Sequence, residues 1–140
     1  MDSRRPRNGI AGFTNAALRQ DRTIVIGRVG QFCGGVRVAE APSWVTDNAL
    51  MTSHIDPKID LDFLALCLEG CQLNRSKIGN YLPLINQRVV HEAKIPLPEL
   101  SVQRQVVSEI RERDRLADSI LKHIETTRLL QSQLSAEFMK

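Results

Sequence analysis

The stretch Ile95-Pro96-Leu97-Pro98-Glu99-Leu100-Ser101-Val102-Gln103 opens a long segment that runs to the end of the chain without Gly or Pro after Pro98. Apolar residues recur in this segment at steps of three and four, which is the spacing of one helix face. Pro98 suits a first helical turn, where its missing N–H costs nothing, and Ser101 is an alternative N-cap. From there to Met139 a helix would span roughly 55–60 Å at 1.5 Å per residue. We therefore predict a long C-terminal helix over residues 98–140.

The apolar positions of this helix predict an interface with another helix. A domain of this size is barely as wide as the helix is long, so part of the helix should project and need a partner. The residues that we expect to be buried there are Val106, Ile110, Ala117, Ile120 and Ile124. Leu134 and Phe138 continue the same face, which polar residues interrupt at Arg113, Thr127 and Gln131. The alternative is a terminal helix that packs only on its own domain.

Composition indicates a globular protein whose positive charge is concentrated at one end. The 140 residues are 42% hydrophobic and 25% charged, with a net charge of +3, and they allow one domain with a core. All of the excess lies before Thr23, where five arginines face only Asp2 and Asp21. Such a basic arm is compatible with a polyanion partner, and it is equally common in a solvated N-terminus.

The cysteine content and the hydropathy indicate the cellular compartment of the protein. Three cysteines, Cys33, Cys67 and Cys71, and the lack of a signal peptide favour a reducing cytoplasm over a disulfide scaffold. No apolar run approaches the ~20 residues that a membrane span needs. We expect a cytoplasmic protein without a membrane partner.

The residues before the long helix predict an α+β fold. β-branched and apolar runs favour strands, and helical spacing favours one internal helix at residues 61–73, with a short helix or turn at residues 85–91. Trp44 opens one of the apolar runs, so we expect it in the core. Residues 1–97 should form a small, twisted, mostly antiparallel sheet with one internal helix, followed by the coiled-coil-like helix over 98–140. The expected strands are residues 23–26, 36–39, 44–46, 49–52 and 92–97.

Motifs for catalysis or cofactor binding do not stand out. The glycine-rich segment 27–35 lacks the Gly-Lys-Ser/Thr of a phosphate-binding loop, and a strand rather than a helix should follow it. Cys67, Cys71 and His91 could outline a metal site, but no fourth ligand occurs at a typical spacing. Neither a nucleophile elbow nor a paired-carboxylate nuclease pattern is present. We expect no catalytic residue, no metal and no cofactor.

Polar residues in two loops predict a binding surface for double-stranded DNA. Arg, Lys, Asn and Gln are the side chains that read base edges and hold phosphates. For any one of these residues, ordinary surface polarity is the alternative. The candidates in the glycine-rich segment, the polar segment 73–84 and the residues just after it are Arg28, Gln31, Lys77, Asn80, Tyr81 and Arg88.

Three stretches in this order resemble a known family. They are Thr23-Ile24-Val25-Ile26-Gly27-Arg28-Val29-Gly30, then Cys33-Gly34-Gly35-Val36, then Trp44-Val45-Thr46-Asp47-Asn48-Ala49-Leu50. Together they resemble a target recognition domain of the specificity subunits of type I restriction–modification systems. Ile95-Pro96-Leu97-Pro98-Glu99-Leu100, with Gln103 and Val106, resembles the junction at which that domain enters the family's long helix.

The resemblance implies a non-catalytic subunit that recognises a DNA sequence for a DNA adenine methyltransferase subunit and a restriction subunit. Family members carry two recognition domains and two long helices that pair antiparallel, whereas this chain has one of each. It would therefore be a half-subunit that dimerises or a fragment of a longer protein, and its C-terminal helix would pair with a second copy or with a second recognition half. The alternatives are a helix-mediated dimeric interaction protein without a DNA role, and a small enzyme with an unrecognised site.

Overall fold

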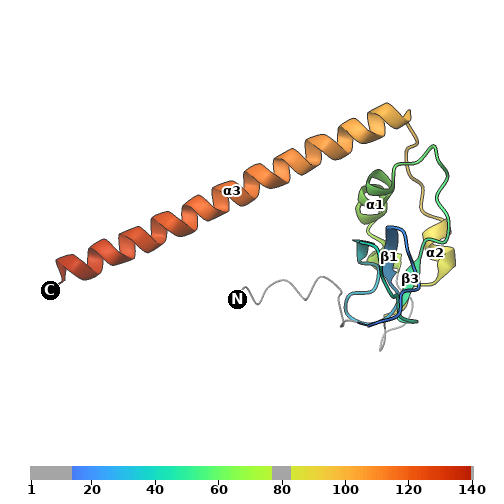
Figure 1. Cartoon of the computed structure of the whole chain (residues 1–140), viewed down its shortest axis with the longest axis horizontal. Helices are drawn as coiled ribbons and strands as arrows, with labels where there is room; N and C mark the ends of the chain where they lie inside the picture. The colour runs from blue at the N-terminus through green and yellow to red at the C-terminus, as the bar shows by residue number, and fades with distance from the viewer. Residues whose placement is uncertain (1–13, 77–82, 140) are drawn as a thin grey trace. The chain divides into compact units, whose positions relative to one another are not determined.

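The structure is a computed structural model that describes residues 14–76 and 83–139. It confirms the α+β fold, with a small antiparallel sheet, short helices and one long C-terminal helix (Figure 1). The chain divides into two compact units, and the division falls between Gln103 and Arg104. The globular unit precedes the division and the helical unit follows it. Each unit is described by itself below.

Three short strands form the sheet of the globular unit. They are β1 (Thr23–Gly27), β2 (Val36–Ala39) and β3 (Ala49–Met51), in the order β2-β1-β3. Both pairs are antiparallel, with Ile26 opposite Val36 in one and opposite Leu50 in the other. Alternate residues of a strand face the same side, so the buried Ile24 and Ile26 both point into the core.

The core lies between the sheet and the short helices. Helix α1 (Leu61–Gly70) packs against β1 and β2 and contributes the buried Leu68. The 3-10 helix η1 (Leu73–Ser76) contributes Leu73, and Ile85 comes from the segment just before helix α2 (Gln87–His91). Two side chains cap these helices: Asp60 accepts from Phe63 N at 3.0 Å, and Asn86 accepts from Val89 N at 3.2 Å.

Two of the predicted strands are wrong. Residues 44–46 are not in a strand, and Trp44 is 54% exposed rather than part of the core. Residues 92–97 are also without regular structure. Pro96 and Pro98 donate no backbone hydrogen bond, which weakens any strand there. The predicted helix over 61–73 ends earlier, at Gly70, because Gln72 adopts a φ of 49° that no helix continues.

Helix α3 (Leu100–Phe138) is the long C-terminal helix, and its 39 residues correspond to about 58 Å. Its first turn belongs to the globular unit through Gln103, whose side chain is fully buried. The amide of Gln103 donates to the carbonyls of Lys58 (3.0 Å) and Pro98 (2.8 Å). A buried amide in this position is therefore satisfied, and it attaches the helix start to the globular unit.

Candidate nucleic-acid interface

The glycine-rich segment 27–35 forms a tight turn between β1 and β2. Gly27 N donates to Gly35 O at 2.9 Å, and Gly34 N donates to Gly27 O at 2.8 Å. Gly34 has a φ of +83°, and a Cβ there would lie 2.5 Å from the backbone nitrogen of Asn74. The turn therefore requires glycine at this position, both for its backbone conformation and for its close approach to η1.

A second segment, far away in the sequence, lies beside this turn. Val29 and Leu84 form an antiparallel bridge. Ile85 N donates to Arg28 O at 2.8 Å, and Gly30 N donates to Pro83 O at 3.0 Å. The two loops that the sequence analysis selected separately are thus joined by backbone hydrogen bonds. Residues 28–30 and residues 83–85 therefore lie side by side in the globular unit.

The candidate side chains of this region are exposed. Arg28 and Gln31 lie in the glycine turn, and both are exposed. Arg75 in η1, which was not among the predicted candidates, is exposed as well. Arg88, in the first turn of α2, is exposed and pairs with Glu92 at 2.7 Å. An ion pair at such an exposed site contributes little to stability. The guanidinium of Arg88 can therefore leave Glu92 and bind another anion, such as a phosphate. Lys77, Asn80 and Tyr81 lie outside the described residues.

One exposed aromatic residue of this region, Phe32, is not among the candidates predicted from the sequence. Phe32 is 61% exposed at the turn, directly between Gln31 and the buried Cys33. Its carbonyl accepts from Gly35 N at 3.1 Å, so its backbone is held within the turn. A period-two pattern could not have identified it, because a tight turn follows no strand periodicity. Trp44, which had been expected in the core, is exposed as well.

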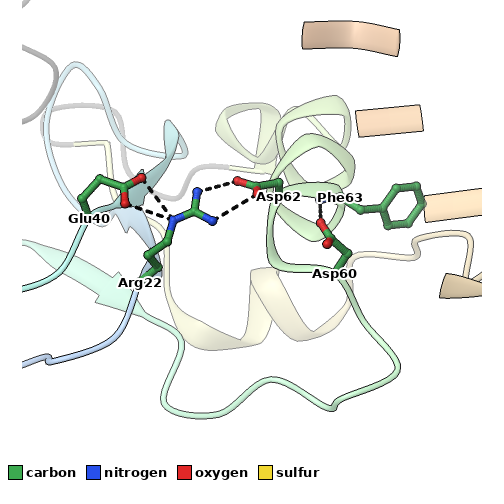
Figure 2. A network of polar contacts seen from close by, with 5 residues as sticks. All are labelled: Arg22, Glu40, Asp60, Asp62 and Phe63. Carbon is green, nitrogen blue, oxygen red and sulfur yellow. Dashed lines mark hydrogen bonds and ion pairs between the residues drawn. The ribbon is translucent and has the colours of Figure 1, made fainter. Parts of the chain in front are cut away.

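A different arginine, Arg22, forms ion pairs within the globular unit. Arg22 forms an ion pair with Asp62 at 2.8 Å and another with Glu40 at 3.1 Å, joining residues that precede β1, follow β2 and start α1 (Figure 2). The hydrogen bonds that the guanidinium of Arg22 donates to Asp62, together with the nearby Glu40, raise the pKa of Arg22 even though burial opposes this. Arg22 therefore stays charged and is not among the candidate DNA contacts.

Cys67 lies in α1, and Cys71 is the C-cap residue of the same helix. Burial raises the pKa of the Cys67 thiol, and the neighbouring Cys71 adds to the rise. Cys71 Sγ donates a weak hydrogen bond to Lys94 O at 3.8 Å. Among residues 14–76 and 83–139, no three ligating side chains of His, Cys, Asp or Glu gather where they could hold a metal ion.

The helical unit carries a set of exposed apolar side chains. Of the residues predicted to be buried against another helix, Ile120 is 60% and Ile124 is 43% exposed. Ala117 is exposed as well, whereas Val106 and Ile110 are half-buried. A shallow hollow on the helix surface is lined by Ile120, Ile124 and Thr127, among others. The central and C-terminal part of this face is therefore exposed in the helical unit.

No protein-family model matches the chain, and no curated protein matches it either. None of the helices in the described part of the chain has the length and apolar content needed to cross a membrane.

Proposed function

We propose that the globular unit recognises a sequence in double-stranded DNA, and that α3 joins it to a second recognition half. The observation that carries the proposal is the backbone pairing of residues 28–30 with residues 83–85. This pairing gathers Arg28, Gln31 and Arg88 into one exposed region. Guanidinium and amide groups on well-held turns are the groups that read base edges in the major groove.

The chain acts in this proposal as a half of a specificity subunit of a type I restriction–modification system, which its sequence resembles. A DNA adenine methyltransferase subunit and a restriction subunit would supply the chemistry, and this chain would supply the target site. The free cysteines Cys33, Cys67 and Cys71 suit the reducing cytoplasm in which such a complex works.

The second half is a second copy of the chain. The exposed apolar residues of α3 support helix pairing, because burying one large aliphatic side chain stabilises an assembly by ~1.5–3 kcal/mol. A closed homodimer has two-fold symmetry, so its two heads would read the two halves of an interrupted palindrome.

The proposal is tested by titrating fluorescent DNA duplexes with the chain, alone and with the methyltransferase subunit. A duplex carrying the target should bind with an affinity that falls steeply as salt rises, because bound arginines and lysines release counterions. A random duplex of the same length is the control. Equal affinity for both duplexes, or no binding to either, would contradict sequence recognition.

The exposed helix face by itself favours a second candidate, a dimeric interaction protein without a DNA role. Residues 23–98 hold seven basic and seven acidic residues, and this balanced charge suits that candidate. The same titration separates the two, since the interaction protein would dimerise and yet show no salt-dependent shift with any duplex.

A further inference from the structure

The interface face of α3 has a symmetric order of residue types about Lys122. From Lys122 toward the N-terminus the face presents large apolar, small, polar and then two apolar residues: Ile120, Ala117, Arg113, Ile110 and Val106. Toward the C-terminus it presents the same order of types: Ile124, Thr127, Gln131, Leu134 and Phe138. These positions alternate in steps of three and four, as the inner positions of a coiled coil do.

We infer that two copies of α3 pair antiparallel about a two-fold axis at the height of Lys122. Ile120 of one copy then faces Ile124 of the other, and Ala117 faces Thr127. Further out, Arg113 faces Gln131, Ile110 faces Leu134 and Val106 faces Phe138. The inference rests on the helix pairing of the proposed function, whose partner it identifies as a second copy in one register. It does not depend on DNA recognition.

The polar residues of the interface face can be buried in this register without losing hydrogen-bond partners. Thr127 Oγ1 already donates to His123 O of its own helix at 2.9 Å, so covering it with Ala117 of the second copy leaves no polar group unsatisfied. Arg113 can donate to the side-chain carbonyl of Gln131 in the second copy, while its long stem lets the charge reach the rim. Each polar residue near the centre thus meets a small or polar one.

The flanking positions agree with the same register. Leu116 and Leu130, which are 55% and 54% exposed, would lie next to each other across the interface. Asp114 would lie next to Arg128 of the second copy, twice by symmetry. Leu121 would meet Leu121 of the second copy beside the axis. Only Glu109 and Glu137, at the outer ends, bring like charges together, where solvent screens them.

Neighbouring registers lose this match. A shift of one heptad in one direction sets Arg113 opposite Ile124 and Gln131 opposite Val106. A shift in the other direction sets Arg113 opposite Phe138 and Gln131 opposite Ile120. Each shift buries polar groups against aliphatic or aromatic side chains without a hydrogen-bond partner, which is costly. The order of residue types therefore selects one register.

Disulfide formation tests the register in the full-length chain with Cys33, Cys67 and Cys71 replaced by Ala. Leu121→Cys alone should form a dimeric disulfide under mild oxidation, because only residues beside the axis meet their own copy. Ile120→Cys alone should not, whereas equal amounts of the Ile120→Cys and Ile124→Cys chains should form a mixed disulfide. Ready cross-linking by Ile120→Cys alone would indicate parallel helices and overturn the proposal.

A charge exchange gives a second readout that does not need oxidation. Residues 114 and 128 lie about 21 Å apart along one helix, so they can interact only between copies. Asp114→Arg should weaken dimerisation about tenfold in analytical ultracentrifugation, as should Arg128→Asp, because each creates two like-charge contacts. The double variant with both changes should regain wild-type dimerisation. A double variant that is weaker than either single one would refute the register.

The outcomes also separate this inference from the proposed function. A dimer that cross-links through other pairs leaves helix pairing intact and removes only the register. A chain that stays monomeric at tens of micromolar would exclude both the helix pairing and the register. Loss of DNA binding with the predicted cross-links intact removes DNA recognition and leaves the register standing.

Discussion

The side chain of Gln103 accepts a hydrogen bond from the backbone N–H of Asp60 at 2.8 Å, across 43 positions of the sequence. Asp60 is itself the N-cap of α1, so one contact joins the starts of α1 and α3. With the bonds to Lys58 O and Pro98 O, the Gln103 amide serves three backbone groups while it is fully buried.

Replacing Gln103 should therefore destabilise the globular unit. Gln103→Ala leaves three backbone groups without partners, and we expect the free energy of unfolding to fall by about 2–4 kcal/mol. Urea unfolding followed by the fluorescence of the single tryptophan, Trp44 in the globular unit, measures the change. The control is Gln105→Ala, an exposed residue of the same helix, which should change stability by less than about 0.5 kcal/mol. Equal effects of the two variants would contradict the assigned role.

Charges placed on the interface face of α3 should abolish dimerisation. Ile120→Lys with Ile124→Lys loses apolar burial of ~1.5–3 kcal/mol per side chain and adds unpaired charges to the centre of the interface. Light scattering should report a monomer. The matched control is Leu129→Lys, because Leu129 is 65% exposed and lies on the opposite side of the helix. It should leave the dimer unchanged, and a persistent dimer in the double variant would count against helix pairing.

Removing basic residues from the two joined loops should impair DNA binding. Arg28→Ala alone should cost ~1–3 kcal/mol and relax specificity at one base pair, if this arginine reads a base. The triple variant with Lys77→Ala and Arg88→Ala should lose most of its affinity and show a shallower salt dependence. The control removes the same charge from the helical unit through Arg104→Ala, Arg115→Ala and Lys122→Ala. Wild-type binding by the loop variant would refute the assigned surface.

The thiol of Cys67 should react slowly at pH 8. Only the thiolate reacts, and burial raises the pKa of Cys67, so the thiolate fraction at that pH lies below that of an ordinary cysteine. Its alkylation rate should keep rising at pH values where a free thiol has already reached its plateau. Residue-resolved mass spectrometry after iodoacetamide treatment measures the rate, and the urea-unfolded chain is the reference. Equal rates in the folded and unfolded chains would contradict the burial of this thiol.

The sequence predicts those elements whose pattern is local. The long helix follows from its three- and four-residue spacing between Pro98 and the C-terminus, and β1 follows from the run Thr23–Ile26. Strand pairing depends on residues far away, and an apolar run does not show whether a partner strand exists. Trp44 belongs to such a run. It follows Ser43, which pairs with Arg19 in an isolated bridge, and it remains exposed.

For the candidate site, too, the sequence predicts the local features but not the long-range contacts. The polar and glycine-rich composition of two loops was visible in the sequence, and Arg28 and Arg88 are indeed exposed. That the loops lie together depends on the bridge between Val29 and Leu84, which no local pattern predicts. Phe32 was missed for a related reason, because its exposure results from the tight turn that Gly30 and Gly34 permit through positive φ angles.

Shortening α3 by one heptad should shorten the distance between the half-sites of the DNA target. Deleting residues 118–124 removes Ile120 and Ile124 and keeps the inner positions in phase, so Ala117 still faces Thr127 of the second copy. The two Gln103 residues of the dimer, about 57 Å apart in the intact helix pair, should approach by roughly 10 Å at 1.5 Å per residue. The spacer of the target should lose about three base pairs at 3.4 Å each. A folded, dimeric deletion variant with an unchanged spacer would contradict this role of the helix.

The most direct measurement is a map of the adenines that the reconstituted complex methylates in genomic DNA, with this chain as the only specificity component. A two-fold dimer of DNA-reading heads predicts one interrupted palindrome with a spacer of fixed length. Methylation at a non-palindromic sequence, or methylation without sequence preference, would contradict the account.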